Sequence, residues 1–187
     1  MTLLQFSALR CGAITLHRIT ETNFKEILAL FNGFPDSDYM LSELKESYYP
    51  DYDPQGRQTL YGFCATLNGS LAGGSILGIS SWPDGRGFTG ADTLTFMRGK
   101  GVAPGSKPHL FYLGFELLGL NRIETGCLVS NIASKRSIEK TPGFQLEGIL
   151  REYARNAQGD FEDEYRYAIL KRDWLRLYEK NKVEVLP

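Results

Sequence analysis

The sequence predicts one mixed α/β domain, a twisted, mostly antiparallel sheet of about seven strands flanked by helices. Three observations support this fold class. Apolar runs rich in aromatic and branched residues alternate with helical stripes along the chain. Asn68-Gly69-Ser70 separates two such runs, as in a tight antiparallel hairpin. Residues 92–129 read as strand, helix and strand, which implies one parallel crossover within the sheet.

Composition and charge narrow the class of protein. The 187 residues are 42% hydrophobic and 23% charged, which is typical of a globular domain with its own core. The 21 basic residues balance 22 acidic ones, so the formal net charge is −1. A chain without a net positive field lacks the electrostatic signature of a nucleic-acid or anionic-membrane partner. We therefore expect neither partner, and no repeat or linker divides residues 1–187.

Cysteine and histidine are too sparse to indicate a metal site. Cys11, Cys64 and Cys127 stand far apart, and His17 and His109 are equally scattered. Isolated cysteines fit a reducing, cytoplasmic compartment. The first residues lack the basic start and long apolar run of a signal peptide, and no apolar stretch reaches the roughly 18–20 residues of a membrane span. We expect a cytoplasmic protein.

The N-terminal part of the chain predicts an arm, a strand and a helix, in that order. Residues 1–12 read as an arm or an additional edge element, and residues 13–19 alternate as a strand does. Apolar side chains recur at helical spacing over 24–31, which predicts a helix with one buried stripe. Gly33 and Pro35 are expected to end that helix.

Residues 36–59 form an acidic, tyrosine-rich segment. A short helix is expected over 42–48, and residues 48–57 are expected to be a loop because Pro50, Pro54 and Gly56 interrupt regular structure. The segment carries six carboxylates: Asp36, Asp38, Glu43, Glu46, Asp51 and Asp53. Such a segment either lines a site for a cationic ligand or is a solvated acidic loop.

The middle of the chain predicts a hairpin followed by one more strand. Residues 60–67 and 71–79 are apolar runs joined by the Asn-Gly turn, in which positive φ costs little. Glycine and proline crowd residues 80–90, which we read as a loop. Residues 92–97 then form the fourth predicted strand, and they lead directly into a glycine-rich turn.

The second half of the sequence predicts two helices and three strands. Their ranges are 110–118, 122–129, 131–140, 144–151 and 163–170. Asn131 is placed to cap the second of these helices, and Gly119 to end the first. The segment after the last strand is expected to begin as a helix and to fray into a tail over 176–187.

The turn Arg98-Gly99-Lys100-Gly101-Val102-Ala103 is the sharpest chemical signal. It lies between a predicted strand and a predicted helix, where free backbone N–H groups and the helix dipole favour an anion. Glycines let the backbone approach a phosphate closely. A tight structural connection is the alternative interpretation. The dinucleotide pattern GxGxxG fails because residue 104 is Pro104, and the Walker pattern is absent.

With this turn as its starting point, the chain resembles the GNAT acetyltransferases, and within them the branch that acetylates the N-termini of ribosomal proteins. Arg98, Gly101 and Ala103 fit the phosphate-loop pattern of that superfamily. GFELLGLNRIET over 114–125 matches the next stretch of the branch. The other matches are Asn131 with Ser134, Gly143-Phe144, Glu147-Gly148, Leu150-Arg151, Gly159, Tyr167-Ala168, Leu170 and Trp174. The resemblance covers roughly residues 13–175, and its specificity lies in the ensemble.

The resemblance implies a single GNAT-like domain whose sheet is splayed between the fourth and fifth strands, with acetyl-CoA as the cofactor. The pantetheine arm is expected along Leu94–Met97, paired with the strand like an additional strand. The residues implied to bind the cofactor are Phe96, Met97, Arg98, Gly99, Lys100, Gly101, Val102, Ala103, Asn131 and Ser134.

The implied reaction is the direct attack of a neutral amine on the acetyl thioester within a ternary complex. A backbone N–H of the fourth strand is expected to stabilise the oxyanion. Ser134 is the first candidate to protonate the leaving thiolate, and Tyr153 is the second. Glu147 and Glu152 are candidates for the base that takes the proton from the amine. Asn131 lines the thiol end in this scheme, although a helix cap alone also accounts for it.

The implied acceptor is a primary amine, on a peptide N-terminus or a small molecule such as a polyamine, and the implied assembly is a monomer or homodimer. Pro104, Gly105 and Pro108 depart from the family pattern, and Pro108 is expected to delay or kink the helix. Thr141-Pro142 adds about one residue before the next motif. These departures keep two alternatives open: an acyl-CoA sensor without turnover, and a domain for another phosphate ligand.

Overall fold

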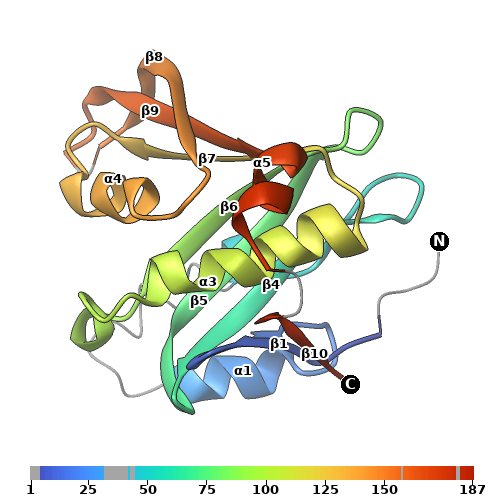
Figure 1. Cartoon of the computed structure of the whole chain (residues 1–187). Coiled ribbons are helices and arrows are strands. Elements are labelled where there is room, and N and C mark those ends of the chain that lie inside the picture. The colour runs from blue at the N-terminus through green and yellow to red at the C-terminus, as the bar shows by residue number, and fades with distance from the viewer. Residues whose placement is uncertain (1–4, 32–41, 43–44, 157, 180–181) are drawn as a thin grey trace.

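The computed structural model of the chain describes residues 5–31, 42, 45–156, 158–179 and 182–187 (Figure 1). The described strands form one ten-stranded sheet in the order β10-β1-β2-β4-β5-β6-β7-β9-β8, and β3 pairs with β4 outside this path. The strands are β1 (Ala8–Cys11), β2 (Ile14–Arg18), β3 (Asp51–Tyr52), β4 (Gln58–Leu67), β5 (Ser70–Ser81), β6 (Arg86–Thr93), β7 (Arg122–Leu128), β8 (Gln145–Arg155), β9 (Phe161–Leu170) and β10 (Glu184–Leu186). The predicted fold class, a mixed and mostly antiparallel sheet flanked by helices, is confirmed, because every pairing is antiparallel except that of β6 with β7. The expected count of about seven strands is too low, because the short strands β1, β3 and β10 give little periodic signal in the sequence.

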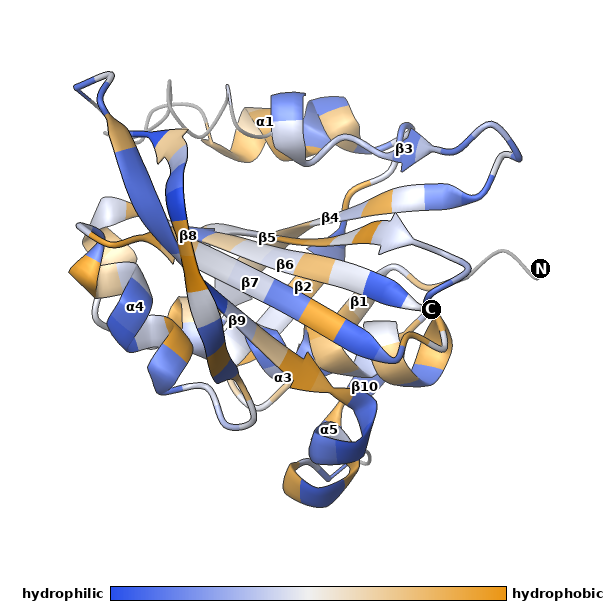
Figure 2. Cartoon of the chain, turned by 90° about the horizontal axis from the view of Figure 1, so that it is seen from above, coloured by the Kyte–Doolittle hydropathy of each residue, from blue (hydrophilic) through white to orange (hydrophobic). Residues whose placement is uncertain are grey.

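Helices cover both faces of this sheet. They are α1 (Phe24–Phe31), α3 (Val102–Phe111), α4 (Ile132–Glu139), α5 (Lys171–Leu177), a 3₁₀ helix at Thr95–Met97 and a π-helical segment at Tyr112–Leu117. In Figure 2, α1 lies on one face, and α3 and α5 lie on the other. None of the helices in the described part of the chain combines the length and hydrophobicity that a membrane span requires.

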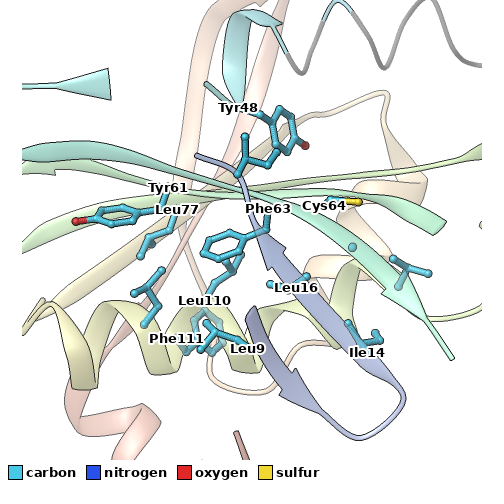
Figure 3. Packing of buried hydrophobic residues seen from close by; sticks show 14 of the residues in the cluster. Leu9, Ile14, Leu16, Tyr48, Tyr61, Phe63, Cys64, Leu77, Leu110 and Phe111 are labelled. Atoms are coloured by element: carbon cyan, nitrogen blue, oxygen red, sulfur yellow. The ribbon is translucent and has the colours of Figure 1, made fainter. Parts of the chain in front are cut away.

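The main core lies between the sheet and α3. Figure 3 shows Phe63 of β4 and Leu77 of β5 pointing toward Leu110 and Phe111 of α3, and all four side chains are fully buried. Alternate residues of a strand point to opposite faces, so one set of strand side chains forms this layer. Tyr48 lies on the opposite face of the sheet in the same view. The two faces are therefore packed by different parts of the chain.

The β4–β5 hairpin confirms the predicted Asn-Gly turn. Leu67 pairs with Ser70, so Asn68 and Gly69 form the two-residue loop. Both have positive φ, 50° and 81° respectively. These angles match the twist of the flanking strands, which explains why the short motif identified the turn from sequence.

The expected loop over 80–90 and the expected strand over 92–97 are wrong. The fourth long strand is β6, which begins at Arg86 and ends at Thr93, and residues 95–97 form a 3₁₀ helix instead. Glycine in β6 serves close packing: a Cβ on Gly87 would lie 2.7 Å from the carbonyl oxygen of Gly78. A Cβ on Gly78 would in turn lie 2.2 Å from the ring of Phe88. Glycines that look like turn residues in the sequence are small strand residues here.

Helix α3 tolerates the prolines that depart from the family pattern. It begins at Val102, so its start is not delayed, and it runs through Pro108 to Phe111. Pro104 falls in the first turn, where a backbone N–H has no helical acceptor in any case. The helix then widens into the π-helical segment, and Gly119 with φ 72° follows its end, as expected for a helix-ending glycine.

Two predictions about irregular segments are wrong. The tail expected to fray contains β10, which pairs with β1 of the predicted N-terminal arm. The expected loop over 48–57 contains β3. Backbone pairing at a sheet edge satisfies N–H and C=O groups that a loop would expose, and short polar strands give little periodic signal. The expected helix end at Gly33 and Pro35 lies outside the described residues.

Candidate functional site

The sheet divides between β6 and β7. These parallel strands pair only over Arg86–Phe88 and Arg122–Glu124. Beyond this closed end, Thr89–Thr93 and Thr125–Leu128 continue without pairing to each other, and we call the gap between them the split. Figure 1 shows β7 and β9 turning away from β5 and β6. The predicted splay between the fourth and fifth long strands is confirmed.

The register assigns the side chains around the split to two faces. Thr89, Thr125 and Cys127 share the face covered by α3, which we call the α3 face. Asp92 and Gly126 lie on the opposite face, which we call the α1 face. At the closed end, the hydroxyl of Thr125 donates to the backbone carbonyl of Thr89 at 3.0 Å. Backbone groups of β6 farther along the split face the gap and suit an extended ligand.

The glycine-rich turn lies where β6 leads into α3. Gly99 and Gly101 have φ of 76° and 79°, a region that side chains disfavour, and a Cβ on either would meet nothing within 4 Å. Gly101 is the N-cap of α3, so the amides of Val102 and Ala103 occupy the first turn of the helix. The two glycines leave open space around a backbone of positive φ, and the first-turn amides of α3 have no helical acceptor. Together these features form a cradle for an anion.

The segment before this turn differs from the expected path of the cofactor arm. Leu94 is fully buried, and its N–H donates to the carbonyl of Ala72 at 3.0 Å. Met97 is buried inside the 3₁₀ helix, whereas Phe96 is 43% exposed. A tight helix cannot present the strand edge that an extended arm needs. The segment with that geometry is Thr89–Thr93 of β6, which pairs with β5 on one side and leaves its edge toward β7 open.

Asn131 and Ser134 lie together at the start of α4. The side-chain oxygen of Asn131 accepts the N–H of Ser134 at 3.0 Å, which confirms Asn131 as the helix cap. Burial raises the pKa of the Cys127 thiol, and a hydrogen bond with the Ser134 side chain acts in the opposite direction. Cys127 and Ile138 of α4 pack in one cluster. Ser134 therefore lies on the α3 face of the split.

Glu147 lies away from the open part of the split. Its carboxylate forms a two-point ion pair with Arg122 at the closed end, in which Nη1 donates to Oε1 at 2.7 Å. Hydrogen bonds from Arg122 hold the pKa of Glu147 below its ordinary value. Glu147 also lines a hollow of about 410 Å³ with Gln145, Ala168, Leu170, Arg172, Asp173 and Arg176. A paired carboxylate of low pKa is a weak proton acceptor.

Tyr153 and Glu152 occupy an irregular part of β8. Glu152 has φ 48°, and its N–H donates to a carboxylate oxygen of Asp163 at 2.8 Å, within a register shift of the hairpin. Tyr153 is exposed, and the guanidinium of Arg166 lies 5.0 Å from the centre of its ring. The bulge accordingly presents Tyr153 to Arg166 and leaves Glu152 in a backbone turn.

Sequence reasoning missed Glu164, which the structure places at the open part of the split. Its side chain on β9 is 15% exposed, and a Cβ on Gly126 would lie 2.4 Å from its Oε1. Burial raises the pKa of Glu164, and the ion pair with Arg166 at 2.6 Å opposes that rise. In the sequence EDEYRY it resembles a solvated strand residue. Only the pairing of β9 with β7 shows that it lies over a glycine.

The other wall of the α1 face is formed by Tyr48, from the tyrosine-rich segment that the sequence offered as a ligand site, and by Asp92, which the sequence did not single out. The ring of Tyr48 lies against Gly74, where a Cβ would be 2.6 Å from it, and its hydroxyl donates to a carboxylate oxygen of Asp92 at 2.8 Å. Within the predicted acidic segment, Asp53 pairs with Arg57 at 2.6 Å. Of the other carboxylates there, Asp36, Asp38 and Glu43 lie outside the described residues.

Comparisons with known proteins agree with this geometry. No family model matches the chain. The uncharacterized N-acetyltransferase p20 of Bacillus licheniformis is 36% identical over 91 residues, which is 49% of this chain and spans half of that relative's length.

Two solved structures have a similar backbone fold. A Vibrio cholerae spermidine N-acetyltransferase, solved with CoA and spermine, has a TM-score of 0.65 at 19% identity, and the match covers 88% of this chain and 99% of that chain. A protein of T. thermophilus assigned as an acetyltransferase has a TM-score of 0.69 at 19% identity, and the match covers 95% of this chain and 100% of that chain. The chain therefore has the GNAT acetyltransferase fold that its sequence motifs predicted.

Proposed function

We propose that the protein is an N-acetyltransferase that uses acetyl-CoA and transfers the acetyl group to a primary amine. The observation that carries this proposal is the split between β6 and β7 with the glycine-rich turn just past its open end. The two features supply the two things that the cofactor needs: a strand edge for the pantetheine arm and an anion cradle for the pyrophosphate. The similarity to p20 supports the same activity.

In this proposal the cofactor lies along β6. The pyrophosphate binds the amides and side chains of Arg98–Ala103, and the arm pairs with Thr89–Thr93 rather than with Leu94–Met97. Arg98 and Lys100 are exposed and add positive charge near the cradle. The thioester then lies toward the closed end of the split, between the α3 face and the α1 face. When bound, the cofactor supplies an acetyl group activated as a thioester.

The proposed transfer forms one C–N bond and breaks one C–S bond. The acceptor nitrogen attacks the acetyl carbonyl, and the electron pair of the C–S bond leaves on sulfur. Ser134 is the first candidate to give that sulfur a proton, because it lies on the α3 face next to Cys127. Tyr153 is the second candidate and lies on the exposed hairpin. Asn131 holds the first turn of α4 and thereby positions Ser134.

The proton of the amine goes to a carboxylate on the α1 face. Glu147 is the base expected from sequence, but its pair with Arg122 and its lowered pKa favour Glu164 for this role. A base works best when its pKa lies near the working pH, and burial moves Glu164 in that direction. Glu164 also lies over Gly126, two residues beyond the paired segment and so inside the split near the expected thioester, whereas Glu147 is held by Arg122 within the paired segment.

We propose a cationic amine as the acceptor. Asp92 and Glu164 place carboxylates on the α1 face at the split, which attracts an ammonium group and holds it near the thioester. The Vibrio cholerae structure with spermine is of a polyamine acetyltransferase with the same fold, and this favours polyamines as the first acceptors to test. A peptide N-terminus, which the sequence motifs suggest, carries the same charge.

The test is calorimetric titration of the purified protein with acetyl-CoA, with CoA and ATP as controls. We expect a Kd in the micromolar range, about −8 kcal/mol. Gly101→Glu should abolish binding, because a carboxylate at the N-cap repels the pyrophosphate and strains a residue at φ 79°. Gly159→Glu is the matched control, since Gly159 also has positive φ and open space but lies in the β8–β9 turn.

The outcomes separate the alternatives. Acetyl-CoA binding with turnover of spermidine or an N-terminal peptide supports the proposed enzyme. Tight acetyl-CoA binding without transfer to any amine favours a sensor of acyl-CoA. Binding of ATP, but neither form of CoA, contradicts the proposal and indicates another phosphate ligand.

A further inference from the structure

Lys107 is a buried charged residue that the proposed reaction does not yet use. It lies on α3 and is 5% exposed, and its Nζ donates to the hydroxyl of Thr89 at 3.0 Å. An ammonium group carries three hydrogens, so the hydrogen bond to Thr89 uses one of three donors. Among the described residues, no carboxylate forms an ion pair with Lys107. A buried charge without an ion-pair partner is costly, which calls for a reason to keep it.

The position of Lys107 relates it to the closed end of the split. Its acceptor, Thr89, is the first residue of β6 beyond the paired segment, and the carbonyl of Thr89 accepts from the Thr125 hydroxyl. Ser75 lies on the same face of the neighbouring strand β5, is fully buried, and its hydroxyl has no partner among the described residues. The hydroxyls of Thr89, Thr125 and Ser75 and the ammonium group of Lys107 thus make a polar floor between this face of the sheet and α3.

The pKa of Lys107 reflects its buried surroundings. Burial lowers its pKa to about 8, and the charge of Asp92, on the opposite face of β6, acts against that shift. The charged groups of α4, Lys135 and Glu139, act on Cys127 and not on Lys107. The other titratable residue buried on α3, His109, turns to the carbonyl of Ile14 on β2. Lys107 is therefore mostly an ammonium group at neutral pH.

We propose that the Lys107 ammonium forms the floor of the closed end of the split and stabilises the negative charge that moves onto the cofactor sulfur during transfer. This inference rests on the proposed function. As the acceptor nitrogen attacks, charge passes from the acetyl oxygen to sulfur when the C–S bond breaks. A fixed positive charge on a buried side chain stabilises the later state more than the neutral thioester. Ser134 can then supply the proton from the same face.

The experiment compares Lys107→Met with the wild type and with His109→Gln. Methionine keeps the unbranched stem and removes the charged group, and His109→Gln alters a buried polar residue of the same helix that faces β2. We expect Lys107→Met to lower kcat on the order of 100-fold, with the KM for acetyl-CoA within a factor of about three because the pyrophosphate cradle is intact. His109→Gln should leave kcat within that same factor.

A second measurement needs no acceptor. Bound CoA is titrated by the ultraviolet absorbance of its thiolate, and we expect the thiol to ionise at lower pH in the wild type than in Lys107→Met, because the ammonium stabilises the thiolate. Thr89→Val, which keeps the charge but removes its hydrogen-bond acceptor, should give an intermediate kcat.

The results distinguish this inference from the proposed function. If the wild type turns over and Lys107→Met has the same kcat and the same thiol titration curve, the role of Lys107 is contradicted. The proposed acetyltransferase activity is then still supported. Absence of acetyl-CoA binding by the wild type overturns both. Equal losses of kcat in Lys107→Met and His109→Gln, matched by equal losses of thermal stability, show that Lys107 is structural.

Discussion

The α3 face and the α1 face of the split differ in how they hold polar groups. On the α3 face, Lys107 and Thr125 are buried beneath a helix and hydrogen-bonded to Thr89. On the α1 face, Glu164 and Asp92 are partly exposed and are held by Arg166 and Tyr48. A buried group keeps a fixed position, whereas a partly exposed group can exchange its partner for a ligand. The contrast suits a face for one constant cofactor and a face for the acceptor.

The largest expected effect separates the two candidate bases on the α1 face. Glu164→Gln should lower kcat by about 100-fold or more, without changing the Kd for acetyl-CoA. Because burial raises the pKa of Glu164, kcat/KM of the wild type should fall with decreasing pH at a pH above the ordinary glutamate range. The measurement is a pH profile with spermidine. Glu147→Gln is the matched variant, and a larger loss there would assign the base to Glu147.

The second effect concerns the burial of charge on the α3 face. The pKa of Lys107 falls from 10.5 to about 8, a difference of about 2.5 units, so the charge destabilises the fold by roughly 3 kcal/mol. Between these pH values the unfolded chain binds more protons, and stability therefore rises with pH. Chemical denaturation should show Lys107→Met more stable than the wild type at pH 7, with a gap that closes toward pH 10.5. A gap independent of pH would contradict the buried charge.

A smaller effect is expected at the helix that carries Ser134. Asn131→Ala removes the cap of α4 and should cost about 1 kcal/mol of unfolding free energy. Asn131→Asp keeps the acceptor oxygen and should cost little. Denaturant titration of both variants measures the cap, and kcat reports whether Ser134 moves with it. If the alanine and aspartate variants are equally stable, the hydrogen bond to the Ser134 amide contributes nothing.

The smallest effect is expected for the ion pair at the closed end of the α1 face. Arg122 and Glu147 are 22% and 42% exposed, so solvent screens their attraction, and a double-mutant cycle should give about 0.5 kcal/mol. The folded pKa of Glu147 is depressed, so this contribution is present at neutral pH and is lost as pH falls through that pKa. A coupling energy that does not decline in acid would show that charge is not its source.

The two faces also differ in what the sequence reveals of them. The glycine turn, the Asn131 cap and the serine at 134 form short local motifs, so the elements of the α3 face could be predicted in order. Lys107 was hidden, because a lysine in a helix is normally solvated. Glu164 and Asp92 meet the split through strand pairing, which depends on residues far apart in the chain. Local patterns do not encode that register.

Strand β6 likewise shows that local sequence patterns do not determine the fold everywhere. Its glycines predict a loop when the sequence is considered alone, because glycine weakens isolated strands. Between two neighbouring strands, the absence of a side chain at Gly87 and Gly78 is what allows Leu120 and Phe88 to pack. The packing partner, and not the local propensity, decides the structure there.

Pro108 divides the helix mechanically. It donates no backbone hydrogen bond, so the carbonyl of Pro104 in the first turn receives no helical bond from residue 108, whereas Pro104 itself costs no bond because of its place in the first turn. The turn that carries the anion cradle can open without unfolding the half that packs in the core. Amide hydrogen exchange should therefore be fast at Val102 and Ala103 and slow at Leu110 and Phe111. A phosphate ligand would close that difference, which makes exchange at the first turn a direct reporter of occupancy.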